Sequence, residues 1–299
     1  MQARGFDYAI LALGVCAVST AALLIREAAA PSLVIAAYRL ALASLPLLAL
    51  TTMQRRPLLG GGRQRILLTI LAGVFLALHF VFWITSVKQT SIATSVFLVT
   101  TSPLFVALAS GPLLGERPTR AMWLGIAIAC LGGAVMVGDD LDAGGDTLMG
   151  DLYALLGAIF ATGYYLVGRR LRTEGEGWLS YVTLAYSVSA VVLVALVLAS
   201  GSALFDYSGR TFAFLGLLAL VPQLIGHTAL NRSLGYLPAV SVSMAVRGEP
   251  IGATILGVIF LNETPTALEI AGAVLVMAGL YVGFRAPATH SPASKTAWG

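Results

Sequence analysis

Two stretches of the chain match each other without a gap. Residues 91–119 read SIATSVFLVTTSPLFVALASGPLLGERPT, and residues 238–266 read PAVSVSMAVRGEPIGATILGVIFLNETPT, at an offset of 147 residues. The matched positions, which continue into the next segment, include Pro103/Pro250, Glu116/Glu263, Pro118/Pro265, Gly125/Gly272 and Gly132/Gly279. Chance rarely places two proline pairs and two glycine pairs in one register. The chain is therefore predicted to hold two copies of one structural unit.

Long apolar segments surround both stretches and recur along the whole chain. The 299 residues are 58% hydrophobic and 11% charged, with a mean hydropathy of +0.88. Soluble proteins carry roughly 25% charged residues, so this chain has too few for a water-facing surface. Apolar runs of about 18 residues or more each predict a membrane-spanning helix. We therefore expect an all-α integral membrane protein with ten transmembrane helices, at residues 7–25, 32–52, 66–86, 90–113, 120–138, 151–169, 178–199, 211–231, 238–261 and 266–284.

The ten predicted helices divide into two repeats of five. The first repeat covers residues 1–146 and the second residues 147–285, and the Ala/Pro/Ser/Thr-rich residues 286–299 are predicted to be a disordered cytoplasmic tail. Because five is odd, the second copy must insert upside down relative to the first. Inverted repeats around a central cavity are typical of transporters that work by alternating access.

The positive charges predict the orientation of the chain. Thirteen Lys and Arg residues fall in loops on one side, whereas the other side has only Arg26, Lys88 and Arg210. Cytoplasmic loops carry the excess of Lys and Arg. We therefore expect a multi-pass protein of a bacterial inner (plasma) membrane with both termini in the cytoplasm. The net charge of +4 comes mainly from these short loops, so it indicates contact with the lipid bilayer and no nucleic-acid partner.

The ends of the matched stretches resemble a known family of transporters. These ends are Ser102-Pro103 with Gly115-Glu116-Arg117-Pro118-Thr119, and Glu249-Pro250 with Asn262-Glu263-Thr264-Pro265-Thr266. They resemble the EamA-type members of the drug/metabolite transporter superfamily, and within it most closely the members that export aromatic amino acids. The resemblance implies ten helices around a central cavity and export of amino acids or similar metabolites. Asn262 departs from the Gly-Glu pair that many members have at this position.

Few ionisable residues lie inside the predicted helices, and they point to a functional site. Arg39, Arg247 and Glu249 are costly in a bilayer, about 2.5–3.5 kcal/mol each on insertion scales, and so are expected to face a cavity or a partner. Pro250 directly follows Glu249, and Pro103 occupies the matching position, so both helices should break there. We predict two hinges beside the substrate site; kinks that only fit neighbouring helices are the alternative.

Polar and aromatic residues at helical spacing predict the lining of the cavity. Gln223, His227 and Asn231 share one helix face, as do His79 and Trp83. The predicted substrate-binding residues are His79, Trp83, Phe97, Thr101, Tyr164, Gln223, His227, Met244, Arg247 and Glu249. Such a lining suits a zwitterion with an apolar side chain. Alternatives stay open: the aromatic residues fit ordinary packing or lipid contact, His79 fits a satisfied interior histidine, and only one of Tyr164 and Tyr165 can face the cavity.

These observations predict an exporter of amino acids, aromatic or otherwise apolar. Export of other amphipathic metabolites or drugs is the alternative, and an integral-membrane enzyme is a weaker one. The sequence contains no P-loop, HExxH or GxSxG motif, so we expect no ATP-driven pump, no catalytic residue, no cofactor and no metal site. Gly279 and Gly283 form a GxxxG pattern, which fits helix packing inside the protein or a homodimer.

Overall fold

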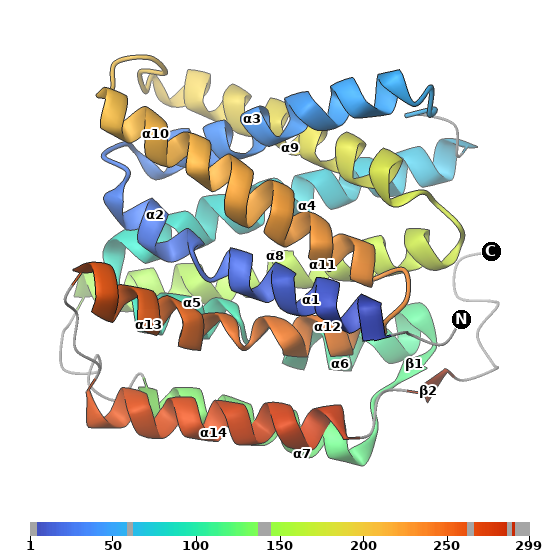
Figure 1. The fold of residues 1–299 in the computed structure, drawn as a ribbon, viewed down its shortest axis with the longest axis vertical. Helices are drawn as coiled ribbons and strands as arrows, with labels where there is room; N and C mark the ends of the chain where they lie inside the picture. Colours follow the sequence, from blue (N-terminus) through green and yellow to red (C-terminus); the bar gives the residue numbers. More distant parts are fainter. Residues whose placement is uncertain (1–4, 59–61, 137–144, 262–265, 286–288, 291–299) are drawn as a thin grey trace.

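The computed structural model describes residues 5–58, 62–136, 145–261, 266–285 and 289–290, and its helices lie side by side in one bundle (Figure 1). The helices of the first half are α1 (Gly5–Val18), α2 (Ala21–Glu27), α3 (Ser32–Met53), α4 (Gly62–Gln89), α5 (Ile92–Val99), α6 (Ser102–Leu114) and α7 (Arg120–Met136). Those of the second half are α8 (Gly145–Thr173), α9 (Trp178–Ser200), α10 (Gly209–Leu218), the π-helix η2 (Ala219–His227), α11 (Thr228–Ser233), α12 (Ala239–Val246), α13 (Glu249–Leu261) and α14 (Ala267–Phe284).

Eight helical segments of the described chain are long and apolar enough to cross a membrane. They are Gly5–Glu27, Ser32–Met53, Gly62–Gln89, Ile92–Leu114, Thr147–Thr173, Trp178–Ser200, Gly209–Ser233 and Ala239–Phe260. The other two predicted spans correspond to the shorter apolar helices Arg120–Val135 and Ile270–Gly283. The helix predicted at residues 66–86 extends over Gly62–Gln89, because Arg and Gln side chains at its ends are compatible with helix although they are not apolar.

Two of the membrane-length helices are interrupted at positions that match in the internal repeat. α5 ends at Val99 and α6 begins at Ser102, while α12 ends at Val246 and α13 begins at Glu249. Pro103 and Pro250 therefore lie in the first turn of the following helix, where a missing N–H costs little. The sequence predicted both interruptions. A third one, between Val18 and Ala21, was not predicted, since no proline marks it.

A run of π-helix interrupts the span formed by α10, η2 and α11. η2 contains Pro222, Gln223 and His227. π-Helical turns are rare and frequently lie at functional sites. The Gln223 carbonyl accepts the backbone N–H of Thr228 and also two hydroxyls, those of Tyr186 at 3.5 Å and Thr228 at 3.4 Å.

The two shorter helices, α7 and α14, pack on each other through glycines. A Cβ atom on Gly125 would lie 2.5 Å from the Gly279 carbonyl oxygen, and one on Gly132 would lie 2.7 Å from that of Gly272. Gly132 follows Gly125 in α7, whereas its contact Gly272 precedes Gly279 in α14, so the two helices run antiparallel. The GxxxG pattern of Gly279 and Gly283 thus packs inside the protein, which is one of the two uses that the sequence left open for it.

Substituting Gly125 with alanine should lower the thermal stability of the purified protein by several degrees. The new methyl group would overlap the backbone of α14, and overpacking of this kind costs about 1–3 kcal/mol. Thermal unfolding in detergent micelles measures the effect. Gly216→Ala in α10 is the matched control, because no atom lies within 4 Å of its added Cβ. Equal melting temperatures for the two variants would contradict the packing described here.

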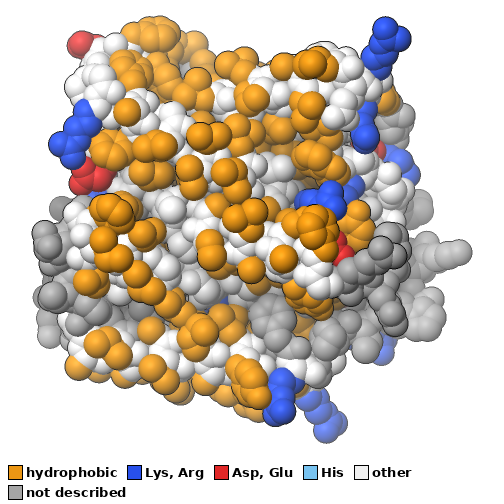
Figure 2. Space-filling view, viewed as in Figure 1, with side chains coloured by type: hydrophobic (Ala, Val, Ile, Leu, Met, Phe, Trp, Pro, Cys, Tyr) orange, Lys and Arg blue, Asp and Glu red, His pale blue; other side chains and the backbone are white. Residues whose placement is uncertain are grey.

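Apolar side chains are exposed over the flanks of the bundle, and charges gather at its ends (Figure 2). Leu45, Val191 and Phe260 are more than half exposed, as expected for lipid-facing residues. The start of α1 and the end of α14 lie at the same end of the bundle, together with β1 (Glu116–Arg117) (Figure 1).

The C-terminal tail contains one element that the sequence did not predict. β2 (Thr289–His290) pairs antiparallel with β1, and Glu116 is opposite His290. These two residues belong to the tail that the sequence predicts to be disordered. The rest of the tail lies outside the described residues.

Candidate functional site

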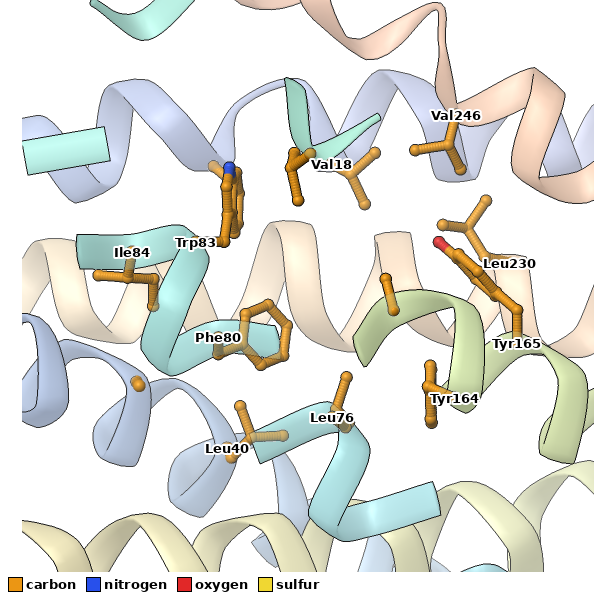
Figure 3. Close-up of a cluster of buried hydrophobic side chains, with 14 of the residues drawn as sticks. Val18, Leu40, Leu76, Phe80, Trp83, Ile84, Tyr164, Tyr165, Leu230 and Val246 are labelled. Carbon is orange, nitrogen blue, oxygen red and sulfur yellow. The ribbon is translucent and has the colours of Figure 1, made fainter. Parts of the chain in front are cut away.

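A small cavity lies inside the bundle, where the interrupted helices meet. Its volume is ≈ 20 Å³, enough for about one water molecule. It is lined by Val18, His79, Trp83, Val99, Thr100, Ser102, Ala161, Tyr165, His227, Leu230, Val246 and Glu249. Figure 3 shows Val18, Trp83, Tyr165, Leu230 and Val246 meeting from separate helices. Such a space admits a metabolite only when the surrounding helices move apart.

His79 and Trp83 form one aromatic wall of the cavity. They lie one helical turn apart on α4, and their rings stack at 5.8 Å between centroids with an interplanar angle of 10°. The His79 Nδ1 atom lies 3.0 Å from the Gly157 carbonyl oxygen, so Nδ1 carries a proton and donates it. This bond fixes the ring, and it shows that His79 is a satisfied interior histidine that also faces the cavity.

Glu249 is the acidic group of the cavity wall. It is buried at the first turn of α13, where the helix dipole favours a negative charge. Within the described part of the chain its carboxylate makes no hydrogen bond and no ion pair. A buried carboxylate without a partner needs a proton or a cationic ligand group. Glu249 is therefore available to bind something that enters the cavity.

Arg39 lies one layer behind the wall of the cavity and is fully buried. Its Nε atom donates to Gln223 Oε1 at 2.8 Å. Its guanidinium carbon lies over the Phe80 ring at 4.2 Å and the Trp83 ring at 5.6 Å. Arg39 and Glu249 form no ion pair with each other among the described residues.

Arg247, Phe97 and Met244 lie together on another side of the bundle, against α7 and α14. Arg247 Nη2 lies 3.3 Å from Cys130 Sγ, and its guanidinium carbon is 5.1 Å from the centre of the Phe97 ring. Phe97 packs on Gly133, and Met244 packs on Gly283. None of the three lines the cavity.

The ten predicted site residues therefore separate into groups. His79, Trp83, His227 and Glu249 line the cavity. Gln223 holds Arg39, and Tyr164 accepts a hydrogen bond from Asn231 at 2.6 Å, so both lie behind the wall. Thr101 lies in the interruption before α6 and donates to the Leu98 carbonyl.

The sequence did not predict several of the residues that line the cavity. Tyr165 faces the cavity in place of Tyr164. The signal was present: Gly157, Ala161 and Tyr165 recur every four residues, so small residues and one ring share a helix face. Thr100 and Ser102 flank the predicted residue Thr101, and only the geometry of the interruption decides which of them faces inward.

A buried ion pair closes the end of the bundle at which β1 lies. Glu116 accepts hydrogen bonds from Arg169 Nε at 2.5 Å and from the Ala239 backbone N–H at 3.0 Å. Arg169 also donates to the Leu234 carbonyl at 2.7 Å. We refer to Glu116, Arg169 and these two backbone groups as the Glu116 clamp. It ties the end of α6 to α8 and to the start of α12, and so joins residues of the two sequence repeats.

Comparison with known proteins agrees with this architecture. The model of the EamA-like transporter family matches the chain twice, over residues 6–138 and 148–285. A solved crystal structure superposes with a TM-score of 0.75 over 94% of this chain and 98% of that one, at 17% identity, which shows a shared fold.

Relatives of known name are transporters as well. The pseudopaline exporter CntI of Pseudomonas aeruginosa is 28% identical over 72% of this chain and 74% of its own length. A probable amino-acid metabolite efflux pump of Salmonella typhimurium is 26% identical over 75% of this chain and 80% of its own length. The uncharacterized transporter YwfM of Bacillus subtilis is 28% identical over 74% of each chain. With two family matches that together cover nearly the whole chain, this protein belongs to the EamA-like transporter family.

Proposed function

We propose that the protein exports amino acids, aromatic or otherwise apolar, by alternating access across a bacterial inner membrane. The observation that carries the proposal is the cavity, in which a buried acid, two histidines and two aromatic rings meet at the interruptions of the helices. Irregular backbone and an unpaired charge inside a membrane are tolerated where they line a pathway for polar molecules.

Alternating access further requires two inverted halves, and contacts between the halves support them. Gly125 and Gly272 occupy matching positions in the two repeats, as do Gly132 and Gly279. In the structure Gly125 instead meets Gly279, and Gly132 meets Gly272, so the contacts are exchanged between the two matched pairs. Exchange of this kind is expected around a two-fold axis. We therefore propose that α7 and α14 also cross the membrane, which gives ten spans in all. Their 17 and 18 residues extend roughly 25–27 Å at 1.5 Å per residue.

Two arginines support the same symmetry. Arg169, near the end of the first span of the second half, donates to the Leu234 carbonyl just after the third span. Arg26, at the end of the first span of the first half, donates to the Thr90 carbonyl just after the third span at 2.8 Å. These equivalent contacts lie at opposite ends of the bundle (Figure 1). With the Lys and Arg excess, they support a cytoplasmic location for the Glu116 end and for both termini.

The relatives support export and leave a second candidate. One is named for export of pseudopaline and another for efflux of amino-acid metabolites. Export of another amphipathic metabolite is therefore the alternative substrate class. The apolar and aromatic share of the lining, from Val18, Trp83 and Tyr165 to Leu230 and Val246, favours substrates with apolar side chains.

Purified protein reconstituted into liposomes tests the proposal. Liposomes should accumulate or release labelled phenylalanine, tryptophan or leucine several-fold faster than protein-free liposomes. Flux no faster than that of protein-free liposomes across the common amino acids would reject the amino acid substrates. Repeating the measurement with and without an imposed proton gradient separates facilitated diffusion from exchange for protons.

A further inference from the structure

We propose that Arg39 binds the carboxylate of the substrate while Glu249 binds its amino group. The transported class is then defined by an α-amino acid unit, whatever its side chain. This inference rests on the proposed function, and it adds a residue and a chemical requirement to it.

Arg39 carries a buried charge that the protein does not neutralise. Its side chain has no exposed surface, and neither Nη1 nor Nη2 has a hydrogen-bond partner within the described residues. A charge buried in the membrane without a counter-ion is destabilising unless it serves a ligand. Ring packing on Phe80 and Trp83 compensates part of this cost while the site is empty, because ring faces attract cations.

Most of the unpartnered groups around Arg39 are donors, and His227 Nδ1, which accepts or donates according to its tautomer, is the exception within the described residues. Arg39 Nε needs an acceptor, so Gln223 presents Oε1 to it and leaves its Nε2 amide group free. The Trp83 indole N–H also has no partner in the described chain. Two guanidinium nitrogens, an amide and an indole N–H therefore lie close together with nothing to accept from them. A carboxylate, which accepts only, is the group that fits them.

Gln223 also orients the guanidinium. Since it occupies Nε, the edge formed by Nη1 and Nη2 stays free, and this edge matches the two oxygens of a carboxylate. Gln223 and His227 both belong to η2, and His227 and Trp83 both line the cavity. Arg39 is thus separated from the cavity by one layer of side chains, which must shift when the cavity widens.

Glu249 supplies the complementary charge. It lies on the cavity wall, and it forms no ion pair with Arg39 in the described structure. In a direct ion pair the two charges would neutralise each other, and neither would remain free to bind the ammonium or the carboxylate of a zwitterion. Opposite charges on the cavity wall and one layer behind it, which a widened cavity would bring to one space, instead match the separated carboxylate and ammonium of an amino acid.

Competition in liposomes tests the carboxylate requirement. The probe is uptake of labelled phenylalanine or leucine, and the competitors are the same compounds without the carboxyl group, phenethylamine and isoamylamine. In the wild type each amine should compete at least tenfold more weakly than the parent amino acid. In Arg39→Met this preference should disappear, because the group that recognises the carboxylate is gone. Arg210→Met, which removes an exposed partner of Glu27, is the control and should keep the preference.

Arg39→Lys guards against a folding defect of the methionine variant. Lysine keeps the charge but lacks the two-pronged edge, so KM should rise at least fivefold with little change in kcat. Equal competition by amine and amino acid in the wild type would overturn the proposal while transport itself stands. So would an Arg39→Lys protein with unchanged KM and preference. No flux of any amino acid in the wild type would instead reject the proposed function.

Discussion

Substituting Glu249 with glutamine should reduce amino acid flux at least tenfold. Glu249 is the acid of the cavity wall, and its carboxylate has no partner in the described structure. A hydrogen bond to a charged group contributes about 1.5–3 kcal/mol, which corresponds to a factor of about 10–100 in binding. Glutamine keeps the shape but has no charge for an ammonium group and no exchangeable acidic proton. Initial rates in liposomes at matched protein density measure the loss.

The control for this prediction is Glu174→Gln. Glu174 forms an ion pair with Arg170 at 3.0 Å, on the exposed end of α8 and away from the cavity. Exposed pairs contribute roughly 0–1 kcal/mol, so flux should be unchanged. If Glu249→Gln and Glu174→Gln gave the same rate, Glu249 would have no special role and the site would have to be placed elsewhere.

Breaking the Glu116 clamp should open the cavity to reagents from the Glu116 end of the bundle, the end that we propose to be cytoplasmic. Arg169→Met leaves Glu116 buried without its ion-pair partner, and loss of one member of a buried pair costs about 3–5 kcal/mol. That energy destabilises the conformation in which α6, α8 and α12 are tied together. A cysteine at Ala161, on the cavity wall, should then react with a charged thiol reagent at least tenfold faster in inside-out vesicles.

Two comparisons make this result specific. Glu174→Gln should leave the reaction rate unchanged, since it removes an exposed pair at the same end of α8. In right-side-out vesicles the reaction in Arg169→Met should become slower, because a shift toward one access state depopulates the other. Faster labelling from both sides would indicate local unfolding, and unchanged labelling would mean that the Glu116 clamp does not close this end.

Much of the fold follows from hydrophobicity and the internal repeat. The gapless match of residues 91–119 with 238–266 predicted the interruptions before Ser102 and Glu249, because proline at a fixed place constrains the backbone in both copies. The interruption after Val18 carries no proline, and Gln223 in the π-helix bonds to Arg39 and Tyr186 from distant parts of the chain. Such features arise from packing between distant segments, which local patterns do not encode.

The site was predicted less completely than the fold. Ionisable residues such as Glu249 and His227 were found because any charge or imidazole in a membrane helix is unusual. Phe97, Met244 and Arg247 were also predicted to bind substrate, but they face α7 and α14, since helical periodicity gives a face without saying which neighbour covers it. The sequence predicts only that Arg39 faces a cavity or a partner and does not identify Gln223 as that partner, because the two residues are 184 positions apart.

The two matched interruptions differ in chemistry, and this has a consequence for the resting protein. One consists of Thr100 and Thr101, and the other of Arg247 and Gly248. The conformation open to one side of the membrane therefore differs in free energy from the conformation open to the other side. An unloaded carrier of this kind spends unequal times facing the two compartments, and its apparent affinity differs between them. The sign of net movement is unaffected, because only an external gradient can make a passive cycle run one way. Without coupling to an ion gradient, net transport therefore reverses whenever the substrate is more concentrated outside.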